Sequence, residues 1–347
     1  HDVLNGRGND NDYDAESGDD IMFQGLGIQR NNGMAGFDWA INKGNPVAAD
    51  SDLGIPIFVN QQANILRDRY DLVEGLSGWT YDDVLTGRDV IIGAYDEEAG
   101  GAAQFDPSSP YQSYSNALTQ EGVDRISGLD QLVAHLARET FTVAGKQETV
   151  VVFDEALVQR DDQGNAITMF DGPSDILIGG GGNDIIMGKD GNDIIDGDRW
   201  LNVRIGIKDA QGNDIGWTDE MGGPVTFTDP AYAAHQGRTL DNMMFDRTLN
   251  PGQLYIIREI LDGDADNSDE DVAVFRGNLE EYSITRNPDG SYTVEHTNPA
   301  DQAIVDGTDR VFNIEILRFA DQDVALNNEP ATGAPVISDT TPTEGET

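Results

Sequence analysis

The chain has 347 residues, of which 64 are Asp or Glu and only 21 are Lys or Arg, so its formal net charge is −43. This acid excess excludes nucleic acids and anionic membrane surfaces as partners, because both are bound through basic patches. The sequence has no cysteine, which excludes disulfides and thiolate metal sites. It has no apolar run of the ~18 residues that a membrane span needs. Self-repulsion on this scale opposes a compact state unless cations neutralise it, so we expect a metal-dependent fold.

Residues 1–92 carry degenerate repeats of glycine and aspartate. Three aspartates at repeat-like spacings are candidate calcium ligands, namely Asp10, Asp20 and Asp38. An irregular, proline-containing stretch follows, as expected of an excursion from a solenoid edge. The repeat resumes with DDVLTG, in which Asp83 is a further candidate ligand. Because the chain starts with HDVL, which fits the middle of a repeat, we expect a fragment of a longer protein.

Residues 93–170 are predicted to be an insertion. Residues 93–119 are rich in Ala, Ser, Gln and Gly, which is typical of a loop. Residues 127–140 have the apolar spacing of a helix, with Ser127 as its N-cap. Residues 150–153 and 167–169 flank the turn signal DQGN, which predicts that they pair as a hairpin.

Residues 171–253 contain the most specific motif. Residues 175–198 read DILIGGGGNDIIMGKDGNDIIDGD and include two nonapeptides of the form G-G-x-G-x-D-x-U-x, at 179–187 and 188–196, the mark of a calcium-binding parallel β-roll. The glycines permit tight turns that expose carbonyls, and Ca²⁺ accepts about six to eight carboxylate and carbonyl oxygens. Ile186 and Ile195 are expected to point inward. The metal ligands expected here come from Gly179, Gly181, Asp184, Gly188, Asp190, Asp193, Asp175 and Asp198.

The remaining residues predict two further units and a tail. Apolar and polar residues alternate over residues 201–207, which predicts a strand that we expect to cap the roll. Residues 239–249 are expected to form a short helix. Residues 254–326 are expected to form a small β domain, and their acidic segment 262–266 is interpreted as a solvated turn or a weak ion site. Residues 327–347, rich in Pro, Thr, Glu and Gly, are predicted to be a linker. Within them, GAPVIS at 333–338 resembles the entry to a bacterial immunoglobulin-like repeat, which implies a following Ig-like domain.

The repeats resemble those of RTX, or haemolysin-type calcium-binding, proteins. Motifs such as VEGLSG at 73–78 and NIEILRFAD at 313–321 also look like the C-terminal region of large bacterial proteins with animal-type haem peroxidase domains. The resemblance implies type I secretion of an unfolded chain and folding outside the cell, where calcium is plentiful. It does not extend to peroxidase activity, because the four histidines lack the setting of a haem site.

The predicted fold is therefore mainly β, with calcium-binding β-roll segments that carry loop and helix insertions, followed by a small β-rich domain. The expected function is that of a non-catalytic extracellular module that binds several Ca²⁺ ions and contacts neighbouring domains of its own chain. A polysaccharide-acting β-solenoid enzyme is one alternative, since solenoids can host paired carboxylates. An adhesin or self-assembling segment with a matrix ligand is another. The sequence leaves open whether residues 1–40 stack directly on residues 175–198.

Overall fold

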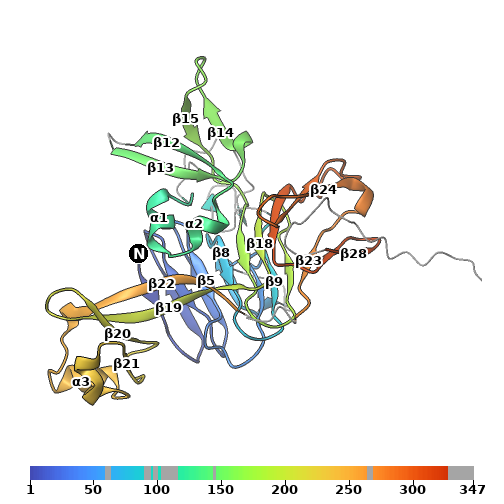
Figure 1. The fold of residues 1–347 in the computed structure, drawn as a ribbon. Coiled ribbons are helices and arrows are strands. Elements are labelled where there is room, and N and C mark those ends of the chain that lie inside the picture. The colour runs from blue at the N-terminus through green and yellow to red at the C-terminus, as the bar shows by residue number, and fades with distance from the viewer. Residues whose placement is uncertain are drawn as a thin grey trace, which may run out of the picture.

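The structure is a computed structural model, and it describes residues 1–58, 64–89, 95–96, 101–102, 116–143, 146–263 and 269–326. The expected linker at 327–347 and most of the expected loop at 93–119 lie outside the described residues. Within them the fold is mainly β (Figure 1). None of the described helices has the length and apolar character needed to cross a membrane.

Most strands belong to three sheets. The first sheet has nine strands in the order β1 (Val3–Leu4), β3 (Ile21–Phe23), β5 (Trp39–Ile41), β8 (Gly75–Ser77), β16 (Ile176–Ile178), β18 (Ile194–Asp196), β26 (Thr308–Phe312), β25 (Tyr292–His296) and β24 (Tyr282–Arg286). The second has six: β28 (Asp323–Ala325), β27 (Ile316–Arg318), β23 (Val272–Val274), β17 (Ile185–Met187), β9 (Val84–Thr86) and β6 (Asp50–Asp52). The third consists of β2 (Asn11–Asp14), β4 (Gln29–Asn32) and β7 (Arg69–Asp71).

The chain alternates between the first sheet and the second or third sheet, and the strands that it adds this way are parallel to their neighbours. We call this arrangement the solenoid. One turn takes 18 residues where no insertion interrupts it, since the amide of Asp175 meets the side chain of Asp193 in the next turn. Two nonapeptides therefore build one turn, each supplying a three-residue strand and the tight loop before it.

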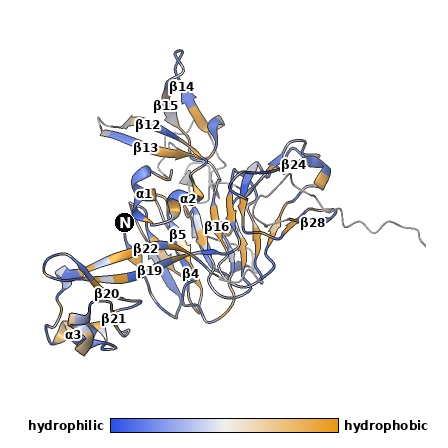
Figure 2. Ribbon diagram, in the orientation of Figure 1, coloured by the Kyte–Doolittle hydropathy of each residue, from blue (hydrophilic) through white to orange (hydrophobic). Residues whose placement is uncertain are grey.

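The hydrophobic core lies between the sheets. The central residue of each short strand points inward, as Leu177 and Ile195 do from the first sheet and Leu85 and Ile186 from the second, and all four are fully buried. This confirms the inward orientation predicted for Ile186 and Ile195. Figure 2 shows that hydrophobic residues gather in the central strands, whereas the loops are largely hydrophilic.

The outer face of the first sheet is covered by the insertions. Its outward side chains, including Trp39 and Ile176, pack with residues of α1 (Gln120–Arg125), α2 (Leu129–Leu132) and the strand β13 (Lys146–Val152). The outer face of the second sheet is more open, because Ile185 is 38% exposed. The first sheet is thus buried on both faces, which suits its runs of consecutive apolar residues.

The insertion differs from its prediction in two places. The expected helix over 127–140 with Ser127 as its N-cap is wrong at both ends. Its N-cap is Gly128, with a φ of 88°, and beyond α2 the strand β12 (Ala137–Val143) pairs with β13 along its whole length. The expected pairing of 150–153 with 167–169 is also wrong. The turn signal instead joins β14 (Val158–Arg160) to β15 (Ala166–Met169). Farther upstream, the two-residue strands β10 (Tyr95–Asp96) and β11 (Gly101–Ala102) pair antiparallel.

Residues 199–262 form a second excursion, which we call the arm. Its strands are β19 (Arg199–Lys208), β20 (Asp214–Thr218), β21 (Thr226–Phe227) and β22 (Leu254–Asp262), and its α-helix is α3 (Leu240–Phe245). β19 pairs with β22 from Arg199 opposite Asp262 to Ile207 opposite Leu254. The arm therefore leaves the solenoid as a long two-stranded ribbon and ends in a lobe around α3, at the lower left of Figure 1. The strand expected to cap the solenoid is part of this ribbon, and Leu201 packs on the outer face of the first sheet.

Residues 269–326 extend the solenoid. β23 pairs with β17 and β26 with β18, whereas the sequence suggested a separate unit from residue 254. Residues 1–41 do not stack directly on residues 175–198, because β8 lies between β5 and β16. The remaining short elements are 3₁₀ helices at Glu155–Leu157, Pro230–His235, Pro251–Gln253 and Leu279–Glu281.

The two faces of β17 provide a matched test of this core. We expect Ile186→Ala to lower the free energy of unfolding by about 2–5 kcal/mol, because it leaves a cavity between the sheets. Ile185→Ala removes the same atoms from an open face and should cost about 1 kcal/mol or less. Chemical denaturation of both variants measures the difference. Equal losses would contradict the assignment of the inner and outer faces.

Candidate metal centres

Two columns of acidic residues run along the loops of the solenoid. In the first column, each acidic residue directly precedes a residue that pairs with a neighbouring parallel strand of the first sheet. This column consists of Asp20, Asp38, Glu74, Asp175, Asp193 and Asp309. The second stands before strands of the second sheet and consists of Asp83, Asp184, Asp271 and Glu315. Because neighbouring strands in a sheet are only about 4.8 Å apart, acidic residues in successive turns lie close together.

Backbone hydrogen bonds fix the carboxylates of the second column. The amide of Asp83 donates to Asp184 Oδ1 at 2.6 Å, and the amide of Asp184 donates to Asp271 Oδ1 at 2.7 Å. The first column repeats this pattern, since the amide of Asp193 donates to Asp309 Oδ1 at 2.9 Å. Each such aspartate uses one oxygen to bind the adjacent turn, which leaves its second oxygen for another partner.

Several of these second oxygens are buried without a hydrogen bond. They are Oδ2 of Asp20, Asp38, Asp184, Asp193 and Asp271. An unpaired polar atom in the interior costs free energy, and a buried charge costs more unless a cation or a metal compensates it. The pattern recurs turn after turn, so it calls for one recurring partner.

Glycines make the space in which these oxygens lie. A Cβ atom on Gly179 would clash with Asp184 Oδ2 and would stand 2.6 Å from the carbonyl oxygen of Gly197 in the adjacent turn. A Cβ atom on Gly188 would clash with Asp193 Oδ2. In the same loop as Gly179, Gly182 has a φ of 117°, which side chains disfavour. The glycines therefore let carboxylate and carbonyl oxygens of adjacent turns come close together.

The electrostatics of the second column are unfavourable without a cation. Burial, followed by the charges of Asp271 and Asp83, raises the pKa of Asp184 to about 9. Burial, followed by the charges of Asp269 and Glu315, raises the pKa of Asp271 to about 8. Among the described residues, no Lys or Arg forms an ion pair with Asp83, Asp184 or Asp271. A metal ion would supply the missing positive charge and favour the ionised carboxylates.

The first column is partly neutralised by side chains instead. The guanidinium of Arg88 is buried between two acids, with Nε 2.7 Å from Asp175 Oδ1 and Nη1 3.2 Å from Glu74 Oε1. Arg276 pairs in the same way with Asp306 and Asp190. Arg88 thus supplies a cation of the protein to this column, whereas the acids that Arg276 pairs with lie outside the column.

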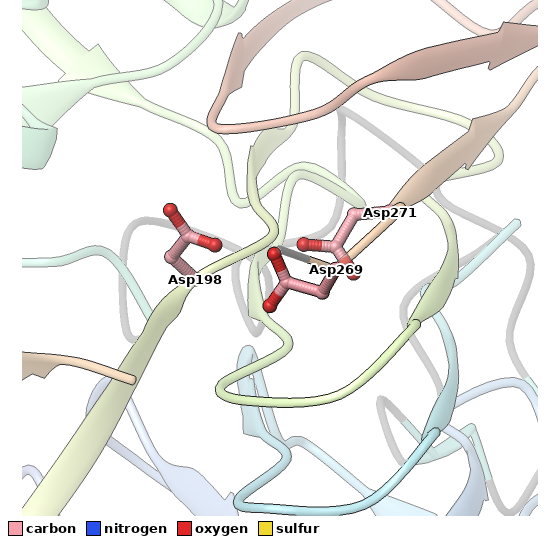
Figure 3. Close-up of side chains that lie close together, drawn as sticks. All are labelled: Asp198, Asp269 and Asp271. Atoms are coloured by element: carbon pink, nitrogen blue, oxygen red, sulfur yellow. The ribbon is translucent and has the colours of Figure 1, made fainter. Parts of the chain in front are cut away.

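A third acidic cluster lies where the arm joins the solenoid. The carboxylates of Asp198, Asp269 and Asp271 offer oxygens that all lie within 4.8 Å of one another (Figure 3). Burial, and then the charge of Asp269, raises the pKa of Asp198 to about 7. Asp198 precedes the arm, whereas Asp269 and Asp271 follow it, so only the folded chain brings the three together.

The structure brings together part of the predicted ligand set. Asp184 lies beside Gly179, Asp193 beside Gly188, and Asp198 lies in the arm cluster. Asp38 lies beside Gly33, which stands five residues before it as Gly179 does before Asp184. The amide of Gly181 donates to the carbonyl of Trp79 at 2.8 Å, which joins its loop to the preceding turn.

The other predicted ligands have protein partners. Asp175 pairs with Arg88, and Asp190 pairs with Arg276. Asp20 pairs with the N-terminal ammonium group at 3.2 Å. Both carboxylate oxygens of Asp83 accept backbone amides, from Ala49 and Trp79. Asp10 is exposed and accepts the amide of Ile28 at 2.9 Å.

Sequence reasoning missed the residues that complete the columns. These are Glu74, Asp271, Asp309 and Glu315, and Asp269 of the arm cluster was missed as well. A usable signal was present at Asp271, because this acidic residue directly precedes the short apolar strand Val272–Val274 without the glycines of a full nonapeptide.

Comparison of the chain with protein-family models, with characterised proteins and with solved structures found no match.

The buried Arg88 contacts give a prediction that does not depend on metal. Arg88→Met should lower the free energy of unfolding by about 3–5 kcal/mol, because it leaves Glu74 and Asp175 buried without a cation. Arg30→Met is the control, since the Arg30–Asp12 pair is exposed and is worth only about 0–1 kcal/mol. Both variants are measured at one saturating calcium concentration, so that the proposed dependence of folding on calcium does not enter the comparison. Similar losses for both variants would contradict the role of Arg88.

Proposed function

We propose that this chain is a calcium-binding structural module, a β-roll of the RTX type, of a large secreted bacterial protein. The observation that carries the proposal is the row of buried carboxylate oxygens without hydrogen bonds, and all of them except Asp20 Oδ2 lie directly against a glycine. The turn of 18 residues supports it, because it equals two of the nonapeptides on which the resemblance rests. In this proposal the carboxylates bind metal and take no part in catalysis.

The donor atoms favour Ca²⁺ over other common metals. Carboxylate and carbonyl oxygens from adjacent turns meet at Gly179, beside Asp184. Calcium accepts about six to eight oxygens in flexible geometry. Mg²⁺ demands a smaller octahedral site and keeps several of its waters. Zn²⁺ prefers thiolate and imidazole ligands, but the sequence has no Cys and the columns contain no His.

Calcium would also decide when the module folds. Without it, the solenoid must either protonate its columns or place ionised carboxylates one strand apart, and the net charge of −43 adds further repulsion. Because the ligands of one site come from different turns, the unfolded chain has no preformed site, and the free energy of ion binding becomes free energy of folding. A chain of this kind would stay unfolded in a low-calcium cytosol and fold after export.

Thermal unfolding monitored by circular dichroism tests the proposal. We expect calcium to raise the unfolding midpoint and chelator to lower it or abolish the transition, since saturation at about 100 times the dissociation constant adds about 2.7 kcal/mol per site. Asp184→Asn should reduce the calcium-dependent part of the stability. Asp162→Asn, at an exposed turn outside the columns, should leave it unchanged.

The decisive result is the difference between the two conditions. If the wild-type chain has the same spectrum and the same unfolding midpoint in calcium and in chelator, metal does not drive its folding. If calcium stabilises the wild type and both variants equally, the ion does not bind at Asp184.

A further inference from the structure

The arm is inserted within one of the solenoid's acidic loops. In an uninterrupted turn, Gly179 follows β16 and Asp184 precedes β17. One turn later, Gly197 follows β18 but the equivalent acid, Asp271, does not precede β23 until the arm is complete. The arm also has its own distal core, formed by Ile207, Ile215, Val225, Leu240, Met243 and Leu249. A folded unit is thus attached to the solenoid at a loop of the candidate metal-binding kind.

Both ends of the arm present carboxylates to each other at this loop. Figure 3 shows Asp198 on the segment that enters the arm, facing Asp269 and Asp271 on the segment that returns from it. Asp198 is 7% exposed and Asp271 is fully buried. The backbone also closes here, because the amide of Gly263 donates to the carbonyl of Asp198 at 2.6 Å.

One oxygen of the cluster lacks a partner. Asp271 Oδ1 accepts the amide of Asp184, but Asp271 Oδ2 is buried without a hydrogen bond. It stands beside Gly197, where an added Cβ atom would clash with both Asp271 Oδ2 and the carbonyl oxygen of Asn313. The cluster therefore combines carboxylates from both ends of the arm with a carbonyl from the following turn. All of these are oxygen donors suited to a hard divalent cation.

We infer that a calcium ion bound by Asp198, Asp269 and Asp271 acts as a clip that fixes the base of the arm to the solenoid. The inference rests on the proposed calcium-binding function and adds a specific task for one ion. Bringing the ends of a long loop together costs conformational entropy, and a metal ion that binds both ends offsets that cost. It also removes the repulsion among three carboxylates whose oxygens lie within 4.8 Å of one another.

The packing of the arm specifies where the clip acts. Leu201, Val203 and Ile260 belong to the core on the outer face of the first sheet, so apolar contacts hold that part of the ribbon without an ion. The last ribbon pair before the cluster is Arg199 opposite Asp262, and we call this pair the root of the arm. Loss of the ion should therefore loosen the root first and leave the distal lobe folded.

Asp269→Asn is the sharpest variant, because it removes a ligand charge while keeping the shape of the side chain. Asp269 does not take part in the ladder of hydrogen bonds between Asp83, Asp184 and Asp271. Glu270→Gln is the matched control, because it removes the same charge from the adjacent, exposed position. Asp198→Asn changes the other end of the arm and should behave as Asp269→Asn does.

Two measurements on the full chain test the clip. Equilibrium dialysis with calcium should show one ion fewer in Asp269→Asn and Asp198→Asn than in the wild type and Glu270→Gln, or an affinity at this site reduced about tenfold or more. Hydrogen exchange followed by mass spectrometry in calcium should show about tenfold faster exchange at the root in the two ligand variants. Exchange at β16 and β17 should not change.

The outcomes separate the clip from the proposed function. If the ligand variants bind as many ions as the wild type with the same affinity and the root stays equally protected, the clip is refuted even where calcium still stabilises the solenoid. If calcium neither binds to nor stabilises the wild type, the proposed function fails, and the clip fails with it. Circular dichroism in calcium establishes that each variant is folded before the comparison.

Discussion

The structure depends on how buried carboxylates are compensated. Parallel strands repeat at every turn of the solenoid, so an aspartate placed before one strand stands next to the aspartate before the adjacent strand. Backbone amides satisfy one oxygen of these side chains, as in the pairs Asp83–Asp184 and Asp184–Asp271. They cannot supply a full positive charge. A cation would supply the charge that the remaining oxygens lack, and among the described residues a side-chain cation is paired only with the first column.

In the first column, the protein supplies part of the charge itself. Arg88 lies between Glu74 and Asp175, and its hydrogen bonds fix both carboxylates. In the second column no such side chain is described at Asp184 or Asp271, and the raised pKa of both groups reflects the missing charge. A guanidinium is permanent, whereas a metal ion depends on its concentration. Under the proposed function, the same solenoid would combine a part whose stability is fixed by sequence with a part that responds to calcium.

The insertions follow the same logic. The arm interrupts the loop between Gly197 and Asp271, and the segment after Arg88 interrupts the loop that ends at Asp175. Short strands that are hydrogen-bonded on both sides cannot accept extra residues without breaking the sheet, whereas a loop at its edge can. The ends of an inserted segment must then be held together. At the insertion after Arg88, the guanidinium of Arg88 donates to Asp175 and so joins the two ends of the inserted segment. In the arm, the cluster of Asp198, Asp269 and Asp271 lies at the corresponding place.

The sequence by itself determined the local unit. The spacing of Gly179, Asp184 and Ile186 defines a loop, an acidic position and an inward-facing residue, because all three depend on neighbours within one nonapeptide. Only the tertiary structure decided which units stack. Asp271 and Asp309 join the columns without a full motif around them, and Ala137–Val143 pairs as a strand where its apolar spacing favoured a helix. Tertiary structure also decided that Asp175 has an arginine partner and that Asp198 meets Asp269. Those contacts join residues separated by whole insertions, and local spacing carries no information about such distances.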